Sequence, residues 1–224
     1  MEKSKRRHFK VAGQSLHNFH IASYAAENEW GIPEMEAQGF DLTGARWQSF
    51  SENRTCKCGD TIIHMFNEDY AINSAWNTPN KYLRIFSKVR AVCTPDFSLY
   101  TDMPRALWLF NVYRKQWLGR FWQEHGIGAI CTVSWPEGFL EDFMLAGIPQ
   151  GATIALSVCG KDIDIGRQRA DIVRILQRLN PAKVYVKAGS SKAESLSRHF
   201  EFETIPRYLT RSEKNGQEAG RGQV

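Results

Sequence analysis

The sequence has no apolar run that approaches the roughly 18 to 20 residues needed by a membrane-spanning helix. Its first residues are basic, and no hydrophobic core of a secretory signal follows them. Hydrophobic residues at 42% and charged residues at 24% are ordinary for a globular domain, which excludes a wholly disordered chain as well as a membrane protein. We therefore expect a cytoplasmic protein with no membrane partner.

Several nucleotide-binding and catalytic motifs are also absent. The chain contains no G-x-x-x-x-G-K-[ST] phosphate loop and no G-x-G-x-x-G dinucleotide loop. None of the six histidines has the spacing of a metal ligand, and no order of Ser, His and Asp typical of a hydrolase triad is recognisable. Dehydrogenase, kinase and zinc-hydrolase interpretations thus lack their required residues.

Cysteine is sparse and odd in number, with five residues in the chain. Cys93, Cys131 and Cys159 fall inside apolar runs typical of buried strands, which favours free, reduced thiols over disulfides. Cys56 and Cys58 suggest zinc, but a structural zinc site normally needs a second ligand pair, and none follows in the sequence. We predict no metal site from this pattern.

Acidic residues are outnumbered by basic ones, and the net charge is +5 with an isoelectric point near 9.0. The excess of lysine and arginine lies largely at the two ends of the chain, in residues 1–10 and 207–224. Basic tails attract phosphates weakly and in a salt-dependent way. Nucleic acid is therefore a candidate partner on charge alone.

From Thr61 onward, short β-branched runs alternate with segments of helical period. Strands are predicted at 61–66, 91–94, 127–133, 153–158, 184–186 and 202–205, and helices at 78–89, 104–126, 139–145, 165–179 and 190–200. Alternation at about 30 residues per unit indicates right-handed βαβ units and a mainly parallel sheet. A TIM-barrel-like, partial (β/α) barrel is the favoured architecture of this α/β fold, and an open doubly wound sheet is the alternative.

The pattern divides the chain into three segments. Residues 1–60 show no sustained period and are expected to form an irregular N-terminal lead-in. Residues 61–209 form the α/β domain, and residues 210–224 are expected to be a disordered basic tail. The lead-in is expected to pack on the main body through Trp30, Phe40, Trp47 and Phe50.

The longest predicted helix begins near Pro104 and stops at Gly126. Asp102 precedes this start and is interpreted as its capping residue. Apolar residues recur along the helix at steps of three and four, which predicts one continuous buried face, formed by Leu107, Phe110, Tyr113, Trp117 and Phe121.

Polar residues follow each predicted strand, and the carboxyl ends of parallel strands meet at the edge where ligands bind. Asp69 follows the first of these strands and Asp96 the second. Neighbouring carboxylates raise one another's pKa or share a positive ion, so both are candidates for general acid and base or for holding a divalent cation. Ser98 and Tyr100 complete the predicted catalytic group, and helix capping is the structural alternative for such residues.

A second group of candidates would bind the ligand as an anion. Gly189, Ser190 and Lys192 lie between a strand and a helix, where free N–H groups and the helix dipole favour a phosphate. Ser190 can equally be a helix cap. Lys161 follows the fourth strand and is added to this ligand-binding group.

Two further side chains have a functional and a structural interpretation. Trp135 follows the third strand and can stack on a base or a sugar, or pack at the rim. Arg114 of the long helix can reach a carboxylate of the site or an outside phosphate, or lie exposed on the surface.

Short motifs occur in a fixed order: Asn67-Glu-Asp-Tyr70, then Pro95-Asp-Phe-Ser-Leu-Tyr-Thr-Asp-Met-Pro104, Tyr113-Arg114, Trp122-Gln123 and Thr132-Val-Ser-Trp135. In this order they resemble an uncharacterised family of phages, mobile elements and bacteria, the domain of unknown function numbered forty-four seventeen. The resemblance extends from about Thr61 to Gly189. It implies a phage or mobile-element setting and no established activity, and it draws interest to Asp69, Asp96, Ser98, Tyr100, Arg114 and Trp135.

One position departs from that family's pattern. A second arginine tends to follow two residues after the first, whereas this chain has Gln116 after Arg114. A two-arginine clamp for an anion is therefore not supported by the resemblance.

The leading hypothesis is a phage-type α/β protein whose strand-end pocket binds a phosphate-bearing ligand, either nucleotide or nucleic acid, with hydrolytic chemistry as an extension. One alternative is a non-enzymatic replication or regulatory accessory that binds nucleic acid through its basic termini. Another is an inhibitor of a host protein. Apart from the divalent cation considered above, the sequence indicates no cofactor.

Overall fold

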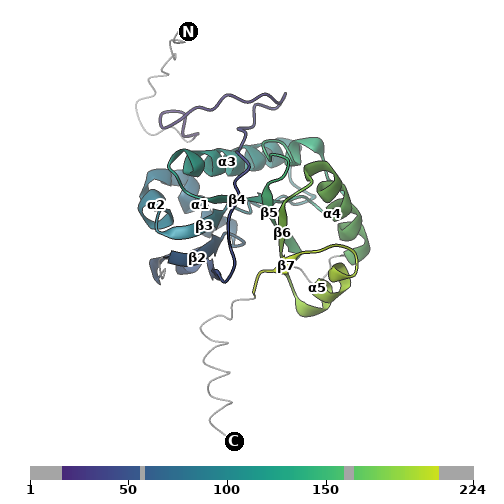
Figure 1. The fold of residues 1–224 in the computed structure, drawn as a ribbon. Helices are drawn as coiled ribbons and strands as arrows, with labels where there is room; N and C mark the ends of the chain where they lie inside the picture. The colour runs from purple at the N-terminus through teal and green to yellow at the C-terminus, as the bar shows by residue number, and fades with distance from the viewer. Residues whose placement is uncertain (1–16, 56–58, 159–163, 207–224) are drawn as a thin grey trace, which may run out of the picture.

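A computed structural model describes residues 17–55, 59–158 and 164–206 of the chain (Figure 1). Its strands are β1 (Arg46–Ser49), β2 (Gly59–His64), β3 (Val89–Cys93), β4 (Ala129–Val133), β5 (Thr153–Val158), β6 (Lys183–Ala188) and β7 (Glu203–Thr204). Its helices are α1 (Asp69–Asn77), α2 (Pro79–Phe86), α3 (Arg105–Glu124), α4 (Ile165–Leu179) and α5 (Ser190–Ser197), with 3₁₀ turns at Phe50–Thr55 and Asp142–Met144. None of the helices in these ranges is both long and apolar enough to cross a membrane. The tail predicted at 210–224 lies outside the described residues.

Every predicted strand is present, with each end within two residues of its predicted position. Helix α1 was not predicted, because its residues follow a strand as a polar run with no clear apolar period. The helix predicted at 139–145 is reduced to the 3₁₀ turn at Asp142–Met144.

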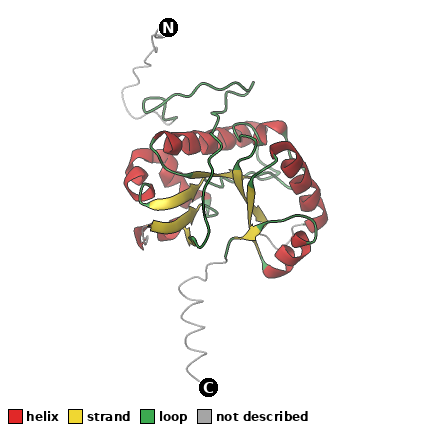
Figure 2. Ribbon diagram, in the orientation of Figure 1, coloured by secondary structure: helices red, strands yellow, loops and turns green. Residues whose placement is uncertain are grey.

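Within the described residues, the seven strands form one parallel sheet whose spatial order is the same as their order along the chain. An open doubly wound sheet needs a point at which strand order reverses, and the described strands have no such point. The sheet is curled, and the helices form an arc on its outer side (Figure 2). The prediction of a partial (β/α) barrel is therefore confirmed.

The segment before residue 60 contributes more to this sheet than the sequence predicts. Strand β1 lies inside the lead-in that was expected to be irregular, and it pairs in parallel with β2. Trp47 of β1 packs on Tyr185 of β6, with ring centroids 4.9 Å apart. A strand of four residues carries too little alternation to be recognised from sequence. Four aromatic residues of this segment lie in or against the buried clusters: Trp30, Phe40, Trp47 and Phe50.

Both faces of the sheet are buried, as parallel strands require. Along β2, Ile63 belongs to the cluster under the helices, whereas its neighbour Ile62 belongs to the cluster on the inner face. Cys93 and Cys131 are buried free thiols on these strands, as predicted. Cys159 lies outside the described residues.

Helix α3 is covered on more than one side. Its predicted face is confirmed at Trp117 and Phe121, which are buried, but Leu107 in the first turn is 46% exposed. The chain before β1 runs over α3 (Figure 1) and brings Met35 onto Gly119, where a Cβ atom would collide with the Met35 sulfur. A larger residue at this close approach would force the side chains of Met35 and Thr94 to move. A contact of this kind cannot be predicted from the period of the helix, because the covering segment has no period of its own.

Candidate functional site

A cleft of about 590 Å³ opens at the carboxyl ends of β3, β4 and β5. In a barrel-like sheet this is the edge at which ligands bind. The walls are formed by the loop after β3, the last residue of β4 with the loop that follows it, one residue of β5 and one of α4. They consist of Asp96, Phe97, Ser98, Leu99, Tyr100, Thr101, Asp102, Val133, Ser134, Trp135, Pro136, Glu137, Ser157 and Gln168. Four predicted site residues are thus brought together here: Asp96, Ser98, Tyr100 and Trp135.

Asp96 belongs to a short chain of hydrogen bonds that leads from the cleft into the core. Ser134 Oγ donates to Asp96 Oδ1 at 2.6 Å, and Lys115 Nζ donates to Ser134 Oγ at 3.3 Å. Lys115 is only 1% exposed. A buried ammonium group is costly unless a negative partner compensates it, so Lys115 and Asp96 act as one unit.

The surroundings shift both groups toward their neutral forms. Burial raises the pKa of Asp96, although the hydrogen bond from Ser134 and the charges of Lys115 and Lys187 oppose this effect. Burial lowers the pKa of Lys115 to about 8, opposed mainly by Asp96. Lys187, at the end of β6, donates to the carbonyl oxygen of Phe66 at 3.0 Å. Asp96 can therefore exchange a proton closer to neutral pH than an ordinary aspartate.

Lys115 was not among the candidates drawn from the sequence, although a signal for it exists. On α3, buried residues recur at steps of three and four, and Lys115 falls on this stripe together with Trp108, Val112, Gly119 and Trp122. A lysine on an apolar stripe is either extended to the surface or paired inside the protein. The structure shows the second arrangement.

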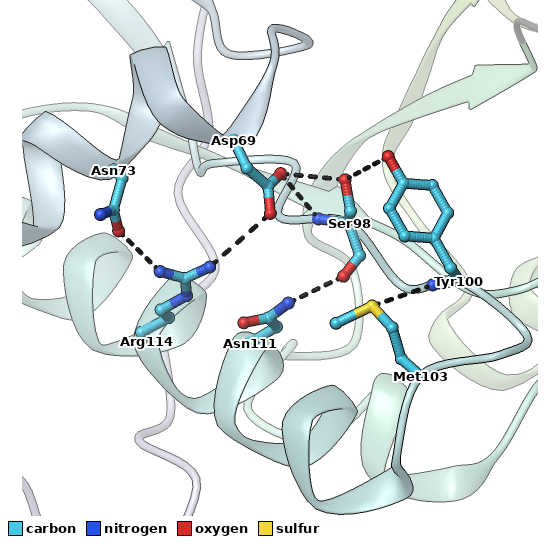
Figure 3. Close-up of polar contacts among 7 residues, drawn as sticks. All are labelled: Asp69, Asn73, Ser98, Tyr100, Met103, Asn111 and Arg114. Carbon is cyan, nitrogen blue, oxygen red and sulfur yellow. Dashed lines mark hydrogen bonds and ion pairs between the residues drawn. The ribbon is translucent and has the colours of Figure 1, made fainter.

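Asp69 and Arg114 hold the back of the loop rather than lining the cleft (Figure 3). Asp69 Oδ1 accepts the backbone N–H of Ser98 at 3.0 Å and lies 2.9 Å from Ser98 Oγ. Arg114 Nη2 lies 3.9 Å from Asp69 Oδ2, and its Nη1 donates to Asn73 Oδ1 at 2.8 Å. Ser98 Oγ is also 3.1 Å from the hydroxyl of Tyr100. These contacts tie the loop to α1 and α3.

Arg114 is further confined by aromatic packing. Its guanidinium group lies 3.4 Å from the ring centroid of Phe97 and 5.6 Å from that of Phe110. Burial lowers its pKa to about 10, and Asp69 opposes this shift. The exposed surface position considered for Arg114 is therefore wrong, and the predicted contact with a carboxylate is present.

Two more bonds from α3 fix the same loop. Asn111 Nδ2 donates to the carbonyl oxygen of Ser98 at 2.7 Å, and Trp108 Nε1 donates to that of Tyr100 at 2.8 Å. Asp102 was expected to cap α3, but the capping residue is Pro104, with no side-chain capping bond. Asp102 instead lines the cleft.

Trp135 is held in place by a buried carboxylate on α4. Its Nε1 donates to Asp171 Oδ2 at 3.0 Å, and the backbone N–H of Gly138 donates to the same oxygen at 3.0 Å. Asp171 is 5% exposed, and Arg174 lies 3.7 Å from its other oxygen. The ring of Trp135 therefore forms a fixed wall of the cleft. Asp171, like Lys115, is a charged residue on a buried helical stripe, which is the sequence signal that could have identified it.

The predicted anion turn lies at the end of β6, and its residues are not among those that line the cleft. Gly189 is the capping residue of α5, so Ser190 is the first helical residue and not the cap. Lys192 is in the first turn of this helix. Lys161 and the basic residues of both termini lie outside the described residues. Within the described ranges, no three His, Cys, Asp or Glu side chains are grouped as metal ligands.

Comparison with known sequences identifies the protein family of this chain. The family described as a domain of unknown function (DUF4417) matches residues 24–202, which include every element but the end of the sheet. The chain belongs to the DUF4417 family. The match begins ahead of β1, so the DUF4417 domain includes the segment that crosses α3.

Relatives of this DUF4417 protein occur in bacteriophages. The chain is 34% identical to the Gene 1 protein of Mycobacterium phage D29 over 163 residues, which are 71% of this chain and 60% of the relative. It is 45% identical to the Gene 1 protein of Mycobacterium phage L5 over 139 residues, or 62% of this chain and 61% of the relative. The aligned part thus spans about three fifths of each relative's length. No solved structure matches the chain. The chain is a phage-type protein of unknown function.

Proposed function

We propose that the cleft binds a nucleoside or nucleotide and that Asp96 acts there as the general acid–base group of a hydrolytic reaction. The observation that supports this proposal is the hydrogen-bonded chain from Asp96 through Ser134 to the buried Lys115. The chain holds the Asp96 carboxyl group at the wall of an accessible cleft, and burial raises the pKa of this group against the opposing effects of Ser134 and Lys115. Displaced carboxyl pKa values in clefts are characteristic of acid–base catalysis.

The chemistry of the walls favours one orientation of the ligand. Asp96, Asp102 and Glu137 line the cleft together with several hydroxyl groups, and among the described lining residues there is no lysine or arginine. Carboxylates accept hydrogen bonds from ribose hydroxyls and repel phosphates. The nucleoside therefore occupies the cleft beside Trp135, and phosphates extend along the sheet edge toward the turn at residues 189–192.

In the proposed reaction, Asp96 accepts a proton from a water molecule while the water oxygen forms a bond to one atom of the ligand and the bond between that atom and the leaving group breaks. The hydroxide joins one product, and Asp96 returns the proton to the leaving group, so that water is consumed and the carboxyl group is regenerated. Ser134 orients the carboxyl group, and the positive charge of Lys115 favours its ionised form. Neither residue needs to contact the ligand.

The test is isothermal titration of the full chain with nucleosides, nucleoside phosphates and short oligonucleotides, combined with product analysis by chromatography. Asp96→Asn should abolish turnover and weaken nucleoside binding by about tenfold or more, because a bond between a charged acceptor and a ligand hydroxyl is lost. Lys192→Ala should weaken nucleotides but not nucleosides. Glu201→Gln is the matched control, since Glu201 is an exposed carboxylate away from the cleft.

The proposal is wrong if the wild-type protein binds no member of this panel. It is also wrong if binding and turnover in Asp96→Asn equal those of Glu201→Gln. Binding without turnover in the wild type would remove the hydrolytic step and leave a nucleotide-binding protein.

A further inference from the structure

Two exposed aromatic side chains, those of Tyr100 and Phe139, lie beside the cleft and have no role in the function proposed above. Tyr100 is 60% exposed and belongs to the cleft wall, and Phe139 is 54% exposed and follows the lining residue Glu137 by two positions. The buried Trp108 connects them: its Nε1 donates to the carbonyl oxygen of Tyr100 at 2.8 Å, and its ring centroid lies 6.4 Å from that of Phe139. We call Tyr100 and Phe139 the aromatic rim.

The aromatic rim is held in a fixed position relative to Trp135 in the cleft wall. Trp135 packs against the same buried cluster as Trp108. In addition, Asp171 Oδ2 accepts both the indole N–H of Trp135 and the backbone N–H of Gly138, which directly precedes Phe139. One aromatic side chain in the cleft wall and two beside the cleft therefore share the same buried supports.

An exposed cation lies on the outer side of the aromatic rim, whereas the cleft itself is acidic. Arg105 follows the loop at residues 95–103 by two positions, and its side chain is 71% exposed. It pairs with Glu141, which is two residues after Phe139. Exposed ion pairs of this kind contribute little to stability, so Arg105 is available to a phosphate as well. Bases and sugars therefore suit the cleft and the rim, and phosphates suit the outer side.

A single nucleotide in the cleft leaves the aromatic rim uncovered. Bases of any identity stack on exposed aromatic side chains, and the neighbouring bases of a single strand are free to do so. In a duplex the faces of the bases are stacked on one another and out of reach. We propose that the ligand of the cleft is a single-stranded nucleic acid, with one base beside Trp135 and the neighbouring bases on Tyr100 and Phe139. This inference rests on the proposed function, because it extends the nucleotide bound in the same cleft by its neighbours in a strand.

The experiment compares ligands of increasing length by isothermal titration of the full chain at about 0.3 M salt, where non-specific attraction of phosphates to the basic ends of the chain is weak. The panel contains a mononucleotide, the trinucleotide of the same base, and an oligonucleotide that is either single-stranded or annealed to its complement. The trinucleotide should bind at least about tenfold more tightly than the mononucleotide, because each stacked base adds to the affinity. The single strand should exceed the duplex by a similar factor.

Phe139→Ser removes one aromatic face of the rim and should reduce the ratio of trinucleotide to mononucleotide affinity to less than about threefold. Phe139→Tyr keeps an aromatic face and should keep the ratio. Phe19→Ser is the matched control and should keep it too, because Phe19 is 58% exposed but packs on Tyr113 and does not line the cleft. Thermal unfolding shows whether each variant is folded, and the comparison of ligands on the wild type needs no variant at all.

The outcomes separate the two proposals. If the wild type binds no member of the panel, the proposed function fails, and the aromatic rim fails with it. If the mononucleotide binds as tightly as the trinucleotide, if the duplex binds as tightly as the single strand, or if folded Phe139→Ser keeps the ratio of the wild type, only the role of the aromatic rim is overturned.

Discussion

The loop at residues 95–103 contains the carboxyl group of Asp96 and contacts that of Asp69, and each of the two carboxyl groups has a cation near it. The two pairs differ in their partners and in their position relative to the cleft. Asp69 accepts the N–H of Ser98 and lies near Arg114, and it is not among the residues of the cleft wall. Asp96 accepts one hydrogen bond from Ser134 and lines the cleft. The pair of Asp69 and Arg114 therefore anchors the loop, whereas Asp96 of the other pair lies at the wall of the cleft.

The cations explain why the roles differ. Arg114 spreads its charge over the Phe97 ring, Asn73 and Asp69, so that its position is fixed by several weak contacts. Lys115 concentrates its charge on one ammonium group that is bonded to Ser134 inside the core. Delocalised guanidinium groups tolerate partial burial better than ammonium groups do. We therefore expect the pair at the cleft to be strongly coupled and the pair behind the loop to be weakly coupled.

Removal of each cation should give the largest difference in stability between the two pairs. Lys115→Met should lower the free energy of unfolding by about 3 kcal/mol at pH 7, because it leaves one member of a buried pair without its partner. Arg114→Met should cost only about 1 kcal/mol, because packing on Phe97 is kept and the partly exposed Asp69 can be solvated. Urea denaturation of both variants measures the difference.

The double variant Lys115→Met with Asp96→Asn provides the control for this prediction. It should recover most of the lost stability, since the uncompensated carboxyl group is then gone. A larger loss in Arg114→Met than in Lys115→Met would contradict the distinction between the two pairs.

Removal of each carboxyl group should show which of the two holds the loop at residues 95–103 in place. Asp69→Ala should lower stability by about 1–2 kcal/mol and strongly accelerate hydrogen exchange at the backbone N–H of Ser98, whose acceptor is lost. Asp96→Ala should leave exchange at Ser98 nearly unchanged. Native-state hydrogen exchange followed by NMR measures both variants, and equal protection of Ser98 in the two would refute the anchoring role of Asp69.

A smaller effect is expected from pH. The pKa of Lys115 is lowered to about 8 in the folded protein from an ordinary value of 10.5, so between these values the unfolded chain binds more protons than the folded one. Stability contributed by this group should therefore rise as pH increases from about 8 toward 10. The urea midpoint of the wild type should exceed that of Lys115→Met, and the difference between the two midpoints should increase as the pH rises from about 8 toward 10. A pH dependence identical in both proteins would show that Lys115 does not titrate as described.

Much of the architecture was predictable because it depends on local patterns. The strands from Thr61 onward and the helices α2 to α5 carry apolar periods that survive in any tertiary context. Strand β1 and helix α1 were missed, since one is only four residues long and the other begins as a polar run. The contact between α3 and the chain segment that precedes β1 could not be predicted either, because no local sequence pattern shows which segments pack against each other.

The candidate site was predictable only in part, and for the same reason. Asp96, Ser98, Tyr100 and Trp135 follow strands, and parallel strands bring such residues to one edge whatever the details of the fold. Lys115 and Asp171 come from helices, and only the packing of those helices decides that their charges point inward at Ser134 and Trp135. The turn at residues 189–192, which was predicted to bind an anion, also follows a strand, but its residues are not among those that line the cleft.

The order of strands and helices, the parallel sheet and the edge at which a ligand would bind were determined by the sequence itself, because each depends on periods and turns within a few residues. Tertiary structure alone decided which carboxyl group faces the cleft and which secures the loop, because that choice depends on side chains of α1, α3 and α4 that are far apart in the chain. Asp69 and Asp96 look alike as residues after strands. Their burial and partners make one an anchor and the other an acid–base candidate.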